Sequence, residues 1–275
     1  QLIYHGGLLC VGGLLAWHFT SPEITWDSFH FLSVLLLIAS VECAWLASVI
    51  VNDCFDIRID QKTNTGRPLI TGTIKHGTFA TLGWFFFFGS LFFSALISFS
   101  VSLLLLIYQA LAWMYSAPPL RLKRIPGIAT LVAAAAGVII LLSGYITITP
   151  RNDFSTFPSL LLLFLFIAYA TALPLKDFKD IEGDQSDGVL TFPVLLGEER
   201  ARIVFGSIFF LLFTASTFIL HLPLVFLPAL FFGSISFFVL QAARQKHRWI
   251  SYRRLPGIMI SIIALYGLVL LWAIF

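Results

Sequence analysis

The sequence predicts an all-α membrane protein, built as a bundle of nine transmembrane helices. Of its 275 residues, 59% are hydrophobic and only 11% are charged, against about 25% charged in an ordinary soluble domain. Apolar runs of about 20 residues recur along the chain, and each is long enough to cross a hydrocarbon core of roughly 30 Å as a helix. The period-2 pattern of a membrane β-barrel is absent, which leaves a helical bundle.

The nine apolar runs give the expected helices in chain order. Each run satisfies its own backbone hydrogen bonds when it is helical, as lipid requires. We expect a single transmembrane domain over 1–275. The runs cover residues 2–20, 29–51, 77–97, 99–117, 127–148, 156–175, 202–221, 223–243 and 256–275.

The basic residues are distributed unevenly between the two sides of the expected bundle. If the helices alternate in direction, the loops after the second, fourth, sixth and eighth helices share one side, and they hold 16 of the 17 Lys and Arg residues. Arg151 alone lies opposite, where the loops 20–27 and 147–155 are short and turn-like. The positive-inside rule therefore places the basic loops in the cytoplasm or the equivalent compartment of an organelle. The net charge of +3 is too small to indicate nucleic-acid binding.

Two acidic clusters with the same spacing lie on this basic side. The segment 68–72 also maps onto 193–197, nearly in register with the clusters. We therefore expect two parallel four-helix repeats, helices 2–5 and helices 6–9, after the first helix. Their acidic ends are expected to face one cavity. A DxxDxxxD pattern occurs twice at an offset of 124, as Asp53, Asp56 and Asp60 and as Asp177, Asp180 and Asp184.

This spacing indicates a metal site. Positions i, i+3 and i+7 lie within a narrow arc of an α-helix, so each triplet presents its carboxylates on one face. Such a row of anions is destabilising by itself, and acids near a membrane are rarely kept without a partner. Mg²⁺ is typically held by one or two carboxylates together with substrate phosphate oxygens. Asn52 adds a neutral oxygen beside the first cluster.

Two other interpretations compete with the metal site. The acids could simply pair with loop bases such as Arg58 and Lys179, which explains one salt-bridged cluster but not two of equal spacing. They could also line an ion or proton pathway, as carboxylates in membranes often do. The clusters, however, sit at helix ends, and no discontinuous helix is evident from the sequence.

A third element is the segment 115–124, which ends in three bases. Basic loops at the cytoplasmic face are usually determinants of topology. Beside two metal-binding clusters, however, the Tyr115 hydroxyl, Arg121 and Lys123 are suitable donors to a diphosphate whose negative charge grows as it leaves. Arg67 is a similar candidate.

Together, these segments resemble the UbiA superfamily of intramembrane prenyltransferases. The resemblance rests on the Asn52-Asp53 pair and the aspartates that follow it, on YSAPPLRLK at 115–123 and on DFKDIEGD at 177–184. Motif order, helix number and the side of the membrane agree over the whole chain. The second and third segments are most similar to the chlorophyll synthase, homogentisate and archaeal ether-lipid branches, and less similar to the 4-hydroxybenzoate branch.

The resemblance implies a reaction and its residues. Two Mg²⁺ ions would bridge a prenyl diphosphate, and a small aromatic or lipid-like acceptor would attack the allylic cation left after diphosphate departs. Tyr115, Arg121 and Lys123 would hold the diphosphate, with the choice between the two bases open. The implied metal ligands are Asn52, Asp56, Asp180 and Asp184, and the implied outer ligands or candidate bases are Asp53, Asp60 and Asp177.

Two rival activities and one further residue stay open. A terpene cyclase of the same fold would quench the same cation within one chain, and a transporter would use the acids for ions. Glu42 lies 11 residues before Asp53, so it points the same way from about 16 Å deeper in the membrane. It either contacts a polar group of the acceptor or is protonated and bonded to a neighbouring helix.

Overall fold

The computed structural model describes residues 2–20, 28–125, 127–150, 152–186, 190–244 and 250–274. Over these ranges the chain is helical, and its extended backbone is limited to an isolated bridge between Arg244 and Ser251. Eight of the described helices are long and apolar enough to cross a membrane. The all-α membrane fold is thus confirmed, while the count of nine spans stays a prediction. Arg151, the loop 21–27 and the loop bases Lys246 and Arg248 lie outside the described residues.

The long helices follow the expected apolar runs closely. Their lengths suit helices that cross a membrane. Side chains such as Phe99, Leu227 and Trp272 are largely exposed, as expected on a lipid-facing surface. In chain order the elements are α1 Leu2–Thr20, α2 Ser28–Thr63, α3 His76–Ala95, α4 Phe99–Ser116, η1 Leu122–Arg124, α5 Ile128–Ile148, α6 Ser159–Ala172, η2 Leu173–Asp180, α7 Ile181–Ser186, α8 Phe192–Leu196, α9 Glu198–Ile219, η3 Pro223–Val225, α10 Phe226–Ala242 and α11 Leu255–Ile274.

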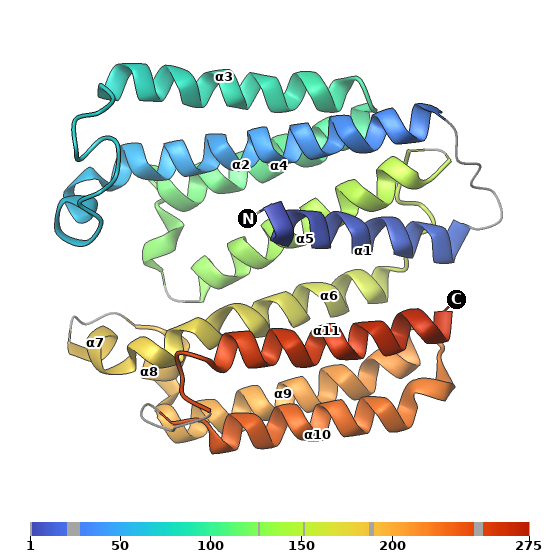
Figure 1. Cartoon of the computed structure of the whole chain (residues 1–275). Helices are drawn as coiled ribbons and strands as arrows, with labels where there is room; N and C mark the ends of the chain where they lie inside the picture. Colours follow the sequence, from blue (N-terminus) through green and yellow to red (C-terminus); the bar gives the residue numbers. More distant parts are fainter. Residues whose placement is uncertain are drawn as a thin grey trace. The chain divides into compact units, whose positions relative to one another are not determined.

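The chain divides into two compact units. The first comprises Gln1–Ile125 and Ala135–Phe157, and the second comprises Pro126–Ala134 and Pro158–Phe275. In the first unit, α2 packs against both α3 and α4, and the three helices lie side by side (Figure 1). The first acidic motif is carried by this three-helix group.

Two glycines let α1 and α5 of the first unit approach each other closely. A Cβ at Gly12 would lie 2.0 Å from the Leu141 carbonyl oxygen, and one at Gly144 would lie 2.5 Å from the Leu9 carbonyl oxygen. Neither position can hold a side chain at this separation. Small residues that bring backbones together are the usual device of helix pairs in membranes, where lipid is as apolar as the side chains.

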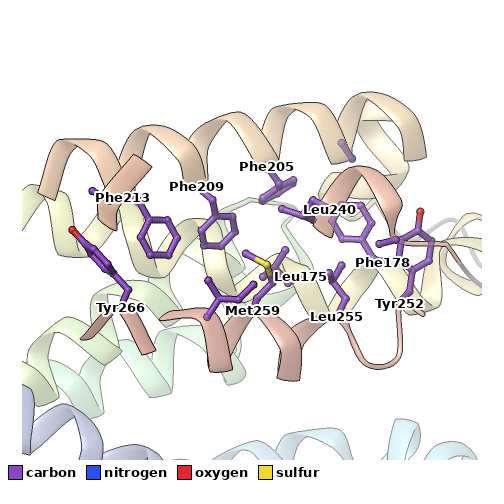
Figure 2. Close-up of a cluster of buried hydrophobic side chains, with 14 residues drawn as sticks. Leu175, Phe178, Phe205, Phe209, Phe213, Leu240, Tyr252, Leu255, Met259 and Tyr266 are labelled. Carbon is purple, nitrogen blue, oxygen red and sulfur yellow. The ribbon is translucent and has the colours of Figure 1, made fainter. Parts of the chain in front are cut away.

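The second unit has an aromatic core between α9, α10 and α11. Figure 2 shows Phe205, Phe209 and Phe213 descending from α9 toward Met259 and Tyr266 of α11. The Phe213 and Tyr266 rings meet edge to face, with centroids 4.9 Å apart. The same core extends to Phe178 of η2, and so it reaches the second acidic motif.

The two acidic motifs differ in local structure although their spacing is identical. The first motif continues α2 well beyond residue 51, where its apolar run ends, and it lies on regular α-helix. The second does not, which corrects the expectation of a regular α-helical face there. Pro174 lacks an N–H and ends the α-helical pattern, so Asp177 and Asp180 lie in the 3₁₀ segment η2 and Asp184 lies in α7. Side chains at i and i+3 eclipse in a 3₁₀ helix, which still brings Asp177 and Asp180 to one side.

Candidate active site

The acids of the first motif form a buried face on α2. Asp53, Asp56 and Asp60 are only 5%, 8% and 4% exposed, whereas Phe55 and Ile59 between them are exposed. Their spacing produces this pattern, because i, i+3 and i+7 share one side of a helix. A buried carboxylate needs charged or hydrogen-bonding partners, and the structure supplies them from the loops after α2 and α4.

Asn52 and Asp56 converge on a single cation, the ammonium group of Lys123. Lys123 Nζ donates to Asn52 Oδ1 at 2.8 Å and also contacts Asp56 Oδ2. Arg121 Nη2 lies 2.7 Å from the other Asp56 oxygen and donates to the Phe55 carbonyl at 3.0 Å. Asp56 is therefore held between two cations, with Asn52 sharing one of them.

Arg67 joins the two outer acids of the same motif. Its guanidinium contacts Asp53, and its Nε lies 3.5 Å from Asp60 Oδ2. Asn64 donates to Asp60 Oδ1 at 2.8 Å. All three predicted diphosphate-binding bases, Arg67, Arg121 and Lys123, thus lie against the acids of the first motif.

The backbone after α4 brings Arg121 and Lys123 to this face. The peptide bond between Pro118 and Pro119 is cis, and Arg121 adopts φ 44°, a left-handed conformation that costs roughly 1 to 2 kcal/mol for a side-chain-bearing residue. The Arg121 N–H closes the turn on the Ala117 carbonyl at 2.9 Å. Burial lowers the pKa of Lys123 below its usual range, while its bond to Asp56 acts in the opposite direction.

Tyr115 and Ser116 end α4 beside these groups. Ser116 donates to Asn52 Oδ1 at 3.2 Å, so Asn52 accepts from both Ser116 and Lys123. Tyr115 is half-buried in the preceding position. The contribution of Ser116 was not predicted from the sequence, although its position directly after Tyr115 in the motif was the available signal.

The acids do pair with bases, but those named in the salt-bridge alternative explain only one contact. Lys179 lies 3.6 Å from Asp180. In the first motif the partners are Arg67, Arg121 and Lys123, which come from loops after two different helices, while Arg58 is exposed on α2. Simple topology determinants would not have to meet on one acidic face.

The acids of the second motif interact electrostatically with one another in η2 and α7. Asp177 is half-buried. Its carboxyl group interacts electrostatically with Asp184 and Asp180, and also with Lys176 and Lys179. Asp180 is exposed, and Asp184 is half-buried. This motif is thus more open than the first within its own unit.

Phe178 anchors the second motif to the aromatic core. Its side chain is fully buried, and its ring lies 5.4 Å from that of Tyr252 and 5.8 Å from that of Phe205 (Figure 2). Because Phe178 stands between Asp177 and the next two motif residues, its packing fixes the backbone that carries the acids. This anchoring role of Phe178 was not predicted from the sequence.

A buried polar group closes the same end of the second unit. Arg202 Nη1 donates to Glu198 Oε1 at 2.6 Å, to the Tyr252 hydroxyl at 2.8 Å and to the Ala243 carbonyl at 3.4 Å. Tyr252 donates to Glu198 at 2.5 Å. Burial, with the bond to Glu198, raises the pKa of Tyr252 to about 12, so its hydroxyl stays a donor at neutral pH. Arg202 and Glu198 thus link α9 to the residues on either side of the loop before α11.

The oxygen ligands that the first motif offers suit a hard cation. Asn52 Oδ1 and an Asp56 oxygen already meet at the Lys123 ammonium, so both oxygens reach one cation site. Among the described residues, no three His, Cys, Asp or Glu side chains group closely enough to hold a metal ion by themselves. Mg²⁺ takes one or two carboxylates and completes its shell with substrate phosphate oxygens and water.

Glu42 has a partner on the neighbouring helix. His5 Nδ1 of α1 lies 2.9 Å from Glu42 Oε1, and the His5 ring meets the Trp45 ring edge to face at 5.9 Å. His5 is buried. The structure thus shows the bond to a neighbouring helix, and contact between Glu42 and an acceptor stays a hypothesis.

Known proteins are similar to this chain in sequence. A digeranylgeranylglyceryl phosphate synthase from Haloquadratum walsbyi is 31% identical over 174 residues, covering 62% of this chain and 58% of that protein. A chloroplastic chlorophyll synthase from Avena sativa is 28% identical over 214 residues, covering 74% and 54%. The chain spans about 60% of the length of the digeranylgeranylglyceryl phosphate synthases that it matches.

The fold also matches solved structures. A UbiA homolog from Archaeoglobus fulgidus, bound to GPP and Mg²⁺, superposes with a TM-score of 0.71 at 21% identity, covering 99% of this chain and 96% of that one. The model of the UbiA prenyltransferase family matches residues 8–273. With its paired acidic motifs, its basic YSAPPLRLK segment and its membrane-spanning helices, this chain belongs to the UbiA prenyltransferase family.

Proposed function

We propose that this chain is a Mg²⁺-dependent prenyltransferase, which moves a prenyl group from an isoprenoid diphosphate to an aromatic or other lipid-pathway acceptor in the membrane. The observation that carries the proposal is the convergence of Asn52 and Asp56 on one cation, with Arg121 beside it. Oxygen ligands and bases in contact are what a metal-bound diphosphate needs. Family membership supports the same reaction.

Each group at the first motif has a proposed role. Asn52 and Asp56 bind metal, and Arg121 and Lys123 turn from these oxygens to the diphosphate when it binds. Arg67 stays with Asp53 and Asp60, or shares a diphosphate oxygen. Tyr115 donates a hydrogen bond from its hydroxyl to the departing diphosphate. These exchanges keep every buried charge paired before and after substrate binding.

The second motif offers further proposed metal ligands. Asp180 and Asp184 are the proposed ligands there, and Asp177, like Asp53 and Asp60, is an outer ligand or the base that takes the acceptor's proton. Two Mg²⁺ ions are proposed, and when bound they would neutralise the charge that develops on the departing diphosphate. We propose that the diphosphate binds at the cytoplasmic, or equivalent organellar, side of the membrane.

The direct test is diphosphate release by the purified chain. Incubation with geranyl diphosphate and a panel of aromatic, chlorin and glycerol-phosphate acceptors should give prenylated product only in the presence of Mg²⁺. Asp56→Asn and Asp180→Asn should each abolish release, whereas Glu199→Gln, an exposed acid at the start of α9, should leave it unchanged. Release that survives EDTA and both substitutions would overturn the proposal.

The same experiment separates the two rival activities. A terpene cyclase would release hydrocarbon product without any acceptor. A transporter would release no diphosphate at all. We expect neither outcome. The proposed diphosphate-binding bases beside the proposed metal ligands argue against a transporter, and membership of the prenyltransferase family favours transfer to an acceptor over cyclisation.

A further inference from the structure

A cavity lies in the first unit. It has a volume of about 360 Å³ and is lined by α2, α3 and α4, a size within the usual range for small-molecule sites. On α2 its wall includes Val51 and Phe55. Each of these is two residues from Asp53, and so about 160° around the helix from it. None of the described residues that line the cavity belongs to the proposed active site, so the two are separate sets of side chains.

The walls of this cavity are aromatic and aliphatic. Trp84 and Phe87 of α3 and Trp113 of α4 line it, and the Trp84 and Trp113 rings lie 6.1 Å apart. Both indoles are partly exposed, so the cavity is open between them and the surroundings of the helices. An apolar molecule dissolved in the bilayer has a route into it.

One polar group in the wall is buried and incompletely bonded. Gln109 of α4 is only 6% exposed and lines the cavity. Its Nε2 donates a long hydrogen bond of 3.4 Å to the Phe87 carbonyl. Gln109 Oε1 has no donor among the described residues and almost no accessible surface. A buried acceptor without a partner is unfavourable, so a ligand donor that reaches Oε1 when the amide turns toward the cavity stabilises it.

The rest of the wall does not suit a water molecule as that donor. A buried water needs two to four polar partners. Ser48 lines the cavity, but its hydroxyl donates to the Trp45 carbonyl at 2.7 Å. His76 also lines it, but it begins α3, 11 residues before Phe87 and so about 16 Å away along the helix. Near Gln109 the wall offers apolar contact and one acceptor.

We propose that this cavity binds an apolar molecule with a single hydroxyl donor, whose O–H bonds to Gln109 Oε1. An ester, ether or hydrocarbon fills the same apolar space but brings no donor. Since Gln109 Oε1 has no donor among the described residues, the proposed bond favours a ligand that carries a hydroxyl. The site is distinct from the proposed active site, and its occupation does not depend on prenyl transfer.

Tryptophan fluorescence tests the proposal without any turnover. The full chain in nanodiscs is titrated with 10-bromodecan-1-ol and, separately, with its methyl ether, since bromine quenches an indole on contact. The alcohol should quench saturably and bind roughly five- to tenfold more tightly than the ether, the worth of one hydrogen bond. Replacing Trp84 and Trp113 together with Phe should remove the saturable part.

Two variants and a control locate the donor contact. Gln109→Leu should keep the quenching and lose the preference for the alcohol. Ala80→Phe, which fills the cavity wall without touching Gln109, should abolish saturable quenching by both probes. Ser90→Ala removes another buried hydroxyl without a partner, on α3 but outside the cavity, and should change nothing. Equal affinity for alcohol and ether in the parent chain, or a preference that survives Gln109→Leu, would overturn the proposal.

Discussion

At the scale of single residues, the negative charges of the first motif are balanced by three neighbouring bases. Three buried carboxylates are met by Arg67, Arg121 and Lys123, and the neutral Asn52 oxygen is included in the same set. A buried charge that loses its partner is costly. The bases therefore compensate the acids in the structure and are placed to compensate a diphosphate in the proposed reaction.

Lys123 gives the sharpest prediction at this scale. Lys123→Ala should lower kcat/KM for the prenyl diphosphate by roughly 10- to 100-fold, because a hydrogen bond to a charged group is worth about 1.5 to 3 kcal/mol. Lys123→Arg should recover part of the loss. Steady-state kinetics at saturating Mg²⁺ give the measurement. The neighbouring Arg124→Ala is the control, because that side chain is exposed, and equal losses in both alanine variants would contradict the role of Lys123.

Phe178 should contribute more to stability than any exposed Phe of the same unit. Its side chain is fully buried against Phe205 and Tyr252, and truncation of a buried Phe to Ala costs about 3 to 5 kcal/mol. We expect Phe178→Ala to lower the thermal unfolding temperature in detergent markedly. Phe238→Ala on α10, where the ring is largely exposed, should leave it nearly unchanged. Similar shifts in the two variants would show that Phe178 is no anchor.

At the scale of elements, close helix packing depends on the absence of side chains at Gly12 and Gly144. The backbones of α1 and α5 approach so closely there that a Cβ would overlap a carbonyl oxygen. This crossing also positions His5 of α1 beside Glu42 of α2. The small residues therefore help to place His5, the partner of Glu42.

Substitution of Gly12 tests this packing. Gly12→Ala should destabilise the chain by about 1 to 3 kcal/mol, the usual cost of overpacking. Gly6→Ala on the same helix should not, because a Cβ there meets nothing within 4 Å. Thermal unfolding of both variants in one detergent gives the comparison. A stable Gly12→Ala variant would mean that α1 and α5 shift apart at little cost.

At the scale of the whole molecule, the charge asymmetry predicts which side each loop occupies. Thr73 follows α2 on the basic side, and Ser155 precedes α6 on the opposite side, and both are exposed. In a chain whose three native cysteines are replaced, Thr73→Cys should react with an impermeant maleimide only from the cytoplasmic side, and Ser155→Cys only from the other. Labelling after solubilisation controls for reactivity. Labelling of both from one side would refute the predicted topology.

The sequence by itself determined the fold class and the helix positions, and it supplied the acids of the proposed site. These depend on local composition: apolar runs must be helical in lipid, and carboxylates at i, i+3 and i+7 share a helix face whatever surrounds them. The single domain and the two parallel repeats remain proposals. The family resemblance, carried by residues 52–60, 115–123 and 176–184, was confirmed by the family model.

Only the tertiary structure decided the partners. Lys123 approaches Asn52 and Asp56 across about 70 residues of sequence. This approach depends on the left-handed backbone at Arg121, which no local sequence pattern predicts. The break at Pro174 likewise gave the second motif a 3₁₀ course that its spacing did not indicate. The anchoring of Phe178 and the unpartnered oxygen of Gln109 are properties of packing between helices. Such contacts depend on which faces meet, and a one-dimensional pattern does not specify that.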